Sequence, residues 1–382
     1  MTIWDDLTQG CCHLTQGYYY STQGCIQASV ERTVGRELSV ADQEREGGVL
    51  EFVNLSVLVP ILLSVMANYG FYPSGRFSEE SFRATYEHGI WRYRVLGREA
   101  VLALDNAFSW ILPADFGLRT QTLYASLPDY SPRFFFSLFV FNTIFLIATA
   151  ALLNLAIGIR PRARYGQTKV LLSVLLVCLM VISGFKVTPY DNLGYACLCA
   201  AVLLTGKRWT LPLGHLLACL VIIVVGTASR ESMALFLSFR FALALHEHGW
   251  RALWSSPKLR AFRIQFALLI SAFLVTYLGL RLVLGRFEFI NAWSTAGLLR
   301  PATFIGLAWA LSLGFVVARV AWSPRFLLYL LVCSAPYLLT IFLAADLYEL
   351  RLYVPLLLLI AMGSEWTQDP LGRPYKNSSL EK

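Results

Sequence analysis

The sequence predicts an all-α fold, a polytopic membrane bundle of about ten transmembrane helices whose long first outer loop carries an amphipathic helix. Hydrophobic residues occupy 57% of the 382 positions and charged residues only 15%, and the mean hydropathy is +0.57. Apolar runs recur along the chain, and Lys and Arg collect in every second connection between them. These observations exclude a water-soluble globular protein and indicate an integral, multi-pass membrane protein.

The candidate spans are apolar runs that approach the length needed to cross a bilayer as a helix, about 20 residues. They comprise residues 52–71, 134–159, 170–186, 192–206, 211–228, 232–246, 264–285, 302–318, 326–345 and 350–363. The runs at 192–206, 232–246 and 350–363 are short for a full crossing. Paired short spans with polar tips at 186–191 and 229–231 would leave an outward-facing aqueous cavity.

Cationic residues orient the bundle, because cytoplasmic loops are enriched in Lys and Arg. Every second connection carries such residues, twelve in total: Arg160, Arg162, Arg164, Lys169, Lys207, Arg208, Arg251, Lys258, Arg260, Arg263, Arg319 and Arg325. The intervening connections carry five: Lys186, Arg230, Arg286, Arg300 and Arg351. The first set is therefore expected in the cytoplasm together with both termini, and the loop 72–133 is expected outside.

The chain divides into three segments. Residues 1–50 are polar and repeat Thr-Gln-Gly every seven residues between positions 8 and 24. We expect them to form a disordered, low-complexity cytoplasmic leader, since they lack the pattern of a signal peptide. Residues 51–363 form the transmembrane domain, and residues 364–382 form a polar cytoplasmic tail.

Composition and motifs exclude several functions. The net charge of +8 resides in short runs between apolar segments, which marks orientation in a bilayer and no nucleic-acid surface. Five of the eight cysteines lie in apolar stretches, and Cys197-Leu-Cys199 lacks the spacing of a redox or zinc motif. Neither a metal nor a cofactor is predicted. The chain also lacks a phosphate-binding glycine loop, an HExxH motif, a nucleophile elbow and a dinucleotide fingerprint.

Ionisable residues at the predicted outer ends of spans are candidate functional residues, because charges at membrane depth are costly and usually face a cavity or a partner. They are Asp191, Arg230, Glu231, Glu349 and Arg351. A competing interpretation treats each as an exposed loop residue or as part of an ion pair that closes a hairpin. Clustering of these side chains on one face favours a functional site.

The first outer loop adds carboxylates and an amphipathic stretch. Its carboxylates are Glu79, Glu80 and Glu87. Glu87 directly precedes His88, whose imidazole a carboxylate can orient. Residues 91–112 mix arginines, among them Arg94, with aromatic and aliphatic residues, as in an interfacial helix with its cations toward headgroups. A helix that only covers the bundle accounts for the same residues. Arg281, near the outer end of its span, is expected to snorkel to the interface.

This arrangement resembles the GT-C class of polytopic membrane glycosyltransferases, which take a sugar from a lipid-phosphate donor on the non-cytoplasmic face. The features that carry the resemblance are a first span, a long outer loop with carboxylates, an amphipathic stretch and paired spans with polar outer tips. They cover most of residues 52–363 as architecture.

By this resemblance, one loop carboxylate is the general base that acts on the acceptor hydroxyl, with Glu87 the first choice, then Glu80 and Glu79. A nearby cation stabilises the departing lipid phosphate, a role that suits Arg230 and Arg351. The other expected substrate-binding residues are Asp191, Glu231, Glu349 and His88. The implied partners are a lipid-linked sugar donor, an acceptor of unknown identity and membrane lipids.

Other classes of membrane protein use similar features. A transporter or lipid flippase lines its pathway with intramembrane charges, although the chain shows no convincing internal repeat. A membrane acyltransferase needs an outer or intramembrane histidine, and only His88 and His215 are available, neither in a recognisable motif. A purely structural membrane subunit is the remaining alternative.

The predicted topology is testable by labelling single cysteines introduced into a cysteine-free variant. An impermeant thiol reagent added from outside is expected to leave Ser255→Cys and Ala163→Cys unlabelled, because both positions lie in cation-rich connections. Labelling of either position from outside would overturn the orientation.

Overall fold

The computed structural model describes residues 48–70, 79–87, 93–116, 131–159, 167–183, 189–284, 308, 311–312, 314–315, 323–344 and 350–366. It divides into two units, one of residues 1–51 with 160–164 and one of residues 52–159 with 165–382. Nearly all of the first unit, and the tail predicted after residue 363 except for its first three residues, lie outside the described residues. The fold below is that of the second unit.

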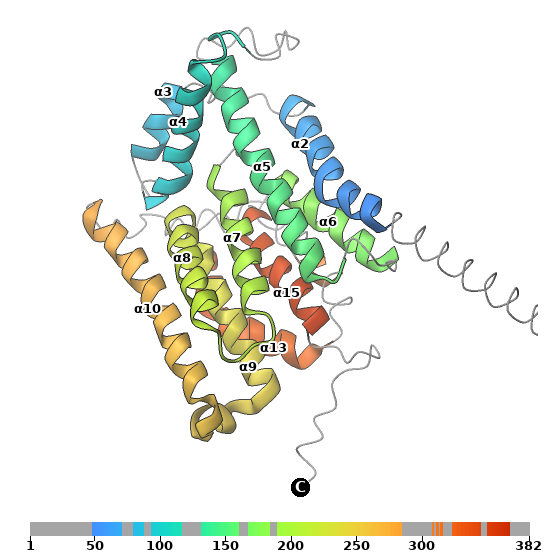
Figure 1. Ribbon diagram of the computed structural model, residues 1–382, viewed down its shortest axis with the longest axis vertical. Helices are drawn as coiled ribbons and strands as arrows, with labels where there is room; N and C mark the ends of the chain where they lie inside the picture. The colour runs from blue at the N-terminus through green and yellow to red at the C-terminus, as the bar shows by residue number, and fades with distance from the viewer. Residues whose placement is uncertain are drawn as a thin grey trace, which may run out of the picture. The chain divides into compact units, whose positions relative to one another are not determined.

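Every regular element in the described part of the chain is helical (Figure 1). The elements are η1 (Asn54–Leu58), α2 (Val59–Gly70), α3 (Glu79–Glu87), α4 (Val95–Ser109), α5 (Pro132–Ala156), α6 (Gln167–Ser183), α7 (Pro189–Thr205), α8 (Leu213–Ser229), η3 (Glu231–Met233), α9 (Ala234–Ser255), η4 (Pro257–Leu259), α10 (Arg260–Val283), α13 (Pro324–Cys333), α14 (Ala335–Ala344), η5 (Leu350–Leu352) and α15 (Val354–Trp366). The all-α prediction is confirmed for these residues.

Three helices in the described residues are long and apolar enough to cross a membrane: Gly48–Ala67, Pro132–Ala156 and Pro257–Val283. A fourth candidate is the pair Pro324–Cys333 and Ala335–Ile341, which bends by 60° at its break. Several shorter apolar helices accompany them. This composition is compatible with an integral membrane protein. The count of ten spans stays a prediction, and the run at 302–318 lies mostly outside the described residues.

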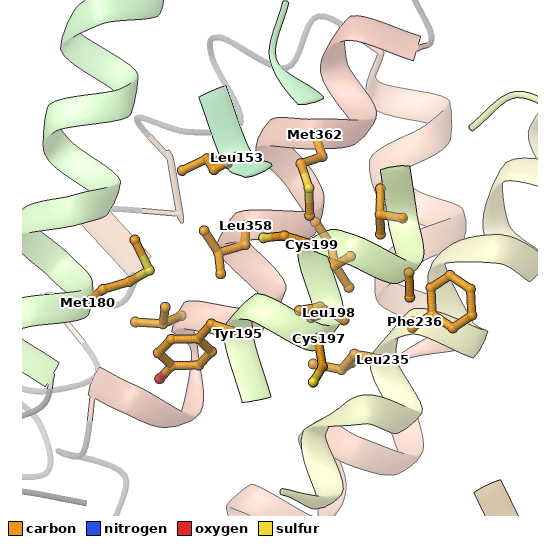
Figure 2. Close-up of a cluster of buried hydrophobic side chains, with 14 of the residues drawn as sticks. Leu153, Met180, Tyr195, Cys197, Leu198, Cys199, Leu235, Phe236, Leu358 and Met362 are labelled. Carbon is orange, nitrogen blue, oxygen red and sulfur yellow. The ribbon is translucent and has the colours of Figure 1, made fainter. Parts of the chain in front are cut away.

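Helix α7 lies at the centre of the core. It packs along α5 and α8, while α10 packs along α8 and α13 along α9. Figure 2 shows Tyr195, Leu198 and Cys199 of α7 among side chains from α5, α6, α9 and α15, including Phe236 and Leu358. A helix that is buried nearly all round, as α7 is, needs apolar residues on all of its faces.

Buried polar side chains join the first helix to its neighbours. The Asn154 amide donates to the Ser56 hydroxyl over 2.9 Å, and the Ser173 hydroxyl donates to the Asn154 carbonyl oxygen over 2.5 Å. The hydroxyls of Ser64 and Thr143 lie 2.8 Å apart. Such interhelical bonds contribute about 1 kcal/mol each between membrane helices. They link η1 and α2 to α5 and α6.

Three cation-rich connections meet at one end of the helices. Trp209 contacts the ring of Phe262, and Leu211 exchanges backbone hydrogen bonds with the Gln265 side chain, so the α7–α8 connection lies beside the start of α10. His246 contacts Phe326, so the start of α13 lies there too. Lys207, Arg208, the 251–263 segment and Arg325 therefore share this end, which we call the basic end.

A tight contact between α7 and α8 at Gly226 supplies a stability test. A Cβ atom at Gly226 would lie 2.9 Å from Met233 Sδ and 3.1 Å from Cys197 Cβ, whereas one at Gly214 of the same helix meets nothing within 4 Å. Gly226→Val is expected to lower the free energy of unfolding by about 1–3 kcal/mol, because the helices must separate. Gly214→Val is the matched control. Equal thermal stability of the two variants in detergent would contradict this packing.

Candidate functional site

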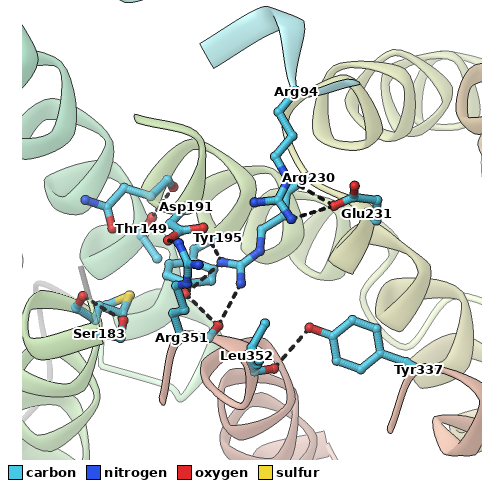
Figure 3. Close-up of polar contacts among 12 residues, drawn as sticks. Arg94, Thr149, Ser183, Asp191, Tyr195, Arg230, Glu231, Tyr337, Arg351 and Leu352 are labelled. Carbon is cyan, nitrogen blue, oxygen red and sulfur yellow. Dashed lines mark hydrogen bonds and ion pairs between the residues drawn. The ribbon is translucent and has the colours of Figure 1, made fainter. Parts of the chain in front are cut away.

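The other end of the same helices carries an arginine cluster, defined by Arg94, Asp191, Tyr195, Arg230, Glu231, Arg281 and Arg351. Asp191 and Tyr195 belong to the first two turns of α7, Arg230 follows α8, and Glu231 begins η3. Arg351 belongs to η5, Arg94 precedes α4, and Arg281 lies in the last turn of α10. Figure 3 shows six of these seven side chains converging from separate elements.

Asp191 pairs with two arginines from distant connections. Its Oδ1 lies 2.6 Å from Arg230 Nη1, and its Oδ2 lies 3.8 Å from Arg351 Nη1. The side chains of Asp191 and Arg230 are each 3% exposed, and that of Arg351 is 7% exposed. Burial of charges costs several kcal/mol per ion unless they are paired and hydrogen-bonded. The ion pairs therefore fix the three connections against one another.

Two hydrogen bonds also hold the Arg230 guanidinium. Its Nη1 donates to the Tyr195 hydroxyl over 2.9 Å, and its Nη2 donates to the Arg351 carbonyl oxygen over 2.9 Å. The Tyr195 hydroxyl in turn donates to that carbonyl over 3.1 Å. Tyr337 of α14 donates to the next carbonyl, that of Leu352, over 3.0 Å. The backbone of η5 is thus held from two sides (Figure 3).

The predicted outer loop reaches this cluster through Arg94. Its Nη2 lies 3.0 Å from Glu231 Oε2, and its Nε donates to the same oxygen over 3.2 Å. Arg94 is 10% exposed and Glu231 27% exposed at the side chain. Burial by itself raises the pKa of a carboxyl, but the Arg94 charge and the hydrogen bonds outweigh it, so the pKa of Glu231 lies below its ordinary value. The pair joins the start of α4 to the α8–α9 turn.

Arg281 differs from the other arginines of the cluster. Its guanidinium carbon lies 4.7 Å from the ring centre of Tyr93 and 4.4 Å from that of Tyr277. Its Nε is buried and finds no hydrogen-bond acceptor among the described residues. Aromatic rings stabilise a guanidinium without neutralising its charge. The position of Arg281 in the sequence predicts snorkelling, whereas its contacts with Tyr93 and Tyr277 appear only in the structure.

Within the described residues, the cluster contains more positive than negative side chains. Its four arginines face two carboxylates, Asp191 and Glu231. Guanidinium groups bind phosphate and carboxylate oxygens with paired, planar hydrogen bonds. The described residues contain no group of three or more His, Cys, Asp or Glu side chains that could hold a metal ion. The arrangement is suited to an anionic ligand.

Two of the three loop carboxylates, Glu79 and Glu80, lie in the first turn of α3. Glu79 is paired with Arg83 over 2.7 Å on the exposed side of α3, and Glu80 is exposed. Glu87 ends α3, and its side chain is not described. α3 is held by Phe82, which packs on Phe134 of α5. No contact among the described residues links Glu79 or Glu80 to the arginine cluster.

Sequence reasoning found part of the cluster. It singled out Asp191, Arg230, Glu231 and Arg351 from the cost of burying charge, and the structure brings these four together. His88 and Glu349 lie outside the described residues. The sequence predicts that Arg94 faces lipid headgroups, but the structure pairs it with Glu231. Tyr195 is not predicted, because a tyrosine in an apolar helix carries no signal of its own.

Comparison with protein-family models, with curated proteins and with solved structures finds no match to this chain. The fold and the cluster therefore carry the functional argument alone.

The central role of Asp191 is testable by charge removal. Asp191→Asn leaves Arg230 and Arg351 without their shared counter-charge and is expected to lower the free energy of unfolding by about 3–5 kcal/mol. Asp105→Asn is the control, because Asp105 is buried too but faces Arg133, which is 22% exposed at the side chain. Equal losses in SDS or thermal unfolding of the purified protein would contradict the assignment.

Proposed function

We propose that the protein is a membrane glycosyltransferase of the GT-C type that moves a sugar from a polyprenyl-phosphate donor to an acceptor on the non-cytoplasmic face. The observation that carries the proposal is the arginine cluster, with its excess positive charge, at the end of the helices opposite the basic end. Arg94 ties the predicted outer loop to that cluster. A lipid-phosphate donor presents its anionic group at the interface of a bilayer, where the proposal places the cluster.

In this proposal the arginines bind and stabilise the lipid phosphate. Arg281 is the most available, because no carboxylate pairs with it among the described residues. Arg230 and Arg351 supply positive potential from fixed positions, since Asp191 holds both. Charge that develops on the departing phosphate oxygen is stabilised by donors that are already in place. Glu231, His88 and Glu349 complete the proposed substrate-binding set.

The proposed reaction needs a base as well as a cation. A loop carboxylate takes the proton of the acceptor hydroxyl, the hydroxyl oxygen bonds to the anomeric carbon of the sugar, and the bond from that carbon to the lipid-phosphate oxygen breaks. Glu87 is the first candidate and Glu80 the second. Glu79 ranks third, because its ion pair with Arg83 favours a structural role.

A transporter or lipid flippase is the second candidate, and one feature favours it. The α13–α14 pair is a broken helix bent by 60°, and discontinuous helices are typical of transporters, where their ends contact the substrate. In such a protein the arginine cluster binds the phosphate of a lipid and releases it unchanged.

A transfer assay with purified protein in lipid vesicles tests the proposal. The donor is a polyprenyl-phosphate carrying a labelled sugar. Glu87→Gln is expected to lower the transfer rate by about 10²- to 10⁴-fold, because the amide cannot accept the proton. Glu99→Gln, on the exposed side of α4, is the matched control and is expected to keep full activity.

Full activity of Glu87→Gln would indicate that Glu80 or Glu79 is the base. Full activity of the triple variant Glu79→Gln/Glu80→Gln/Glu87→Gln would reject a base in this loop. Arg281→Gln and Arg351→Ala are expected to weaken the engagement of the donor and to raise its KM. Movement of an intact lipid across the vesicle membrane, without a transfer product, would select the transporter interpretation.

A further inference from the structure

The connection between α9 and α10 lies at the basic end and begins at a break in α9. Gly249 interrupts α9 with φ 73° and ψ 163°, a conformation that residues with a side chain rarely adopt. The helix resumes in a new direction over its last turn and then passes through η4 into α10. The redirected segment, residues 250–260, is called the α9–α10 connection below.

Two tryptophans form the exposed apolar side of this connection. Trp250 is 60% exposed and Trp254 is 55% exposed. They stand four residues apart on one helix face, with ring centres 5.7 Å apart, and Trp250 also contacts Phe241. Tryptophan is enriched at both membrane interfaces, where its ring lies at headgroup depth. Such a pair, left exposed beside an apolar bundle, fits the boundary between headgroups and acyl chains.

The same connection is positively charged. Arg251, Lys258 and Arg260 are exposed. Arg263 is used internally, since it donates to the carbonyl oxygens of Leu253 and Ser256 and so caps the redirected turn. The sequence contains no acidic residue between Glu247 and Glu288. The exposed cations therefore have no internal counter-charge in this stretch, and they complement an anionic surface.

Helix α10 is long enough to cross a bilayer from the α9–α10 connection to the arginine cluster. Its 24 residues span about 36 Å at about 1.5 Å per residue, enough to cross a hydrocarbon core of about 30 Å. Arg260 starts the helix at the basic end, and Arg281 closes it between Tyr93 and Tyr277 at the arginine cluster. A bilayer crossed by α10 places the α9–α10 connection at one interface and the arginine cluster near the other.

We infer that the α9–α10 connection is a binding surface for anionic lipids. Trp250 and Trp254 lie at the boundary between headgroups and acyl chains, and Arg251, Lys258 and Arg260 contact the phosphates of the headgroups. This surface is independent of the proposed reaction, because it lies at the opposite end of α10 from the arginine cluster.

Lipid selectivity of the full-length protein tests the charge component. The protein is reconstituted in phosphatidylcholine vesicles, and its association with spin-labelled phosphatidylglycerol and phosphatidylcholine is compared by electron paramagnetic resonance. Arg251→Gln/Arg260→Gln is expected to weaken the preference for phosphatidylglycerol by about five-fold per cation removed. Arg83→Gln/Arg98→Gln removes the same charge at α3 and α4 and is expected to keep the preference. Equal effects of the two pairs would overturn the inference.

The depth of the connection tests the aromatic component. An environment-sensitive fluorophore on Ser255→Cys, in a cysteine-free variant, is expected to be quenched by doxyl-labelled phosphatidylcholine. Trp250→Ser/Trp254→Ser is expected to reduce that quenching. Emission typical of water without quenching would overturn the inference. Efficient cross-linking of two Ser255→Cys chains in the absence of anionic lipid would also overturn it, since a second copy would then cover the tryptophans.

Discussion

The ion pairs of Asp191 with Arg230 and Arg351 constrain the rest of the structure. These charges are almost fully buried, and an unpaired charge in such surroundings costs several kcal/mol. The start of α7, the end of α8 and η5 must therefore come together before the buried charge that each carries is paired. Glu231 follows Arg230 directly in the chain, so the ion pair of Arg230 also positions Glu231. Glu231 in turn pairs with Arg94, which precedes α4.

Positive charge plays two different roles at the two ends of these helices. At the basic end Arg251, Lys258 and Arg260 of the α9–α10 connection are exposed, and the connection contains no acidic residue, which suits a headgroup layer. At the arginine cluster the cations are buried or half-buried and are held by carboxylates, carbonyl oxygens or tyrosine rings, which suits one bound anion. Fixed donors act on developing charge without reorganising, whereas flexible surface cations follow mobile lipids.

The sequence predicted the helices well because membrane helices satisfy their own backbone hydrogen bonds, and this requirement appears directly as apolar runs. The number of spans stays a prediction. Helices α7 and α8 match predicted spans but are 17 residues long each, and hydropathy does not distinguish a short buried helix from one that crosses. The break between α13 and α14 leaves no mark in the hydropathy pattern, because both halves are apolar.

Composition and charge placement alone determined the helical class, the grouping of cations in alternate connections and the charges that require partners. Tertiary structure decided which residues pair with these charges. The Tyr195 hydroxyl donates to the Arg351 carbonyl 156 positions away, and Arg94 pairs with Glu231 137 positions away. Hydropathy and the cost of burying a charge are properties of each residue, so they indicate that Asp191 and Arg230 need a partner of opposite charge or a hydrogen bond. The choice of partner depends on which helix ends packing brings together, and for Arg281 it selected tyrosine rings instead of a carboxylate.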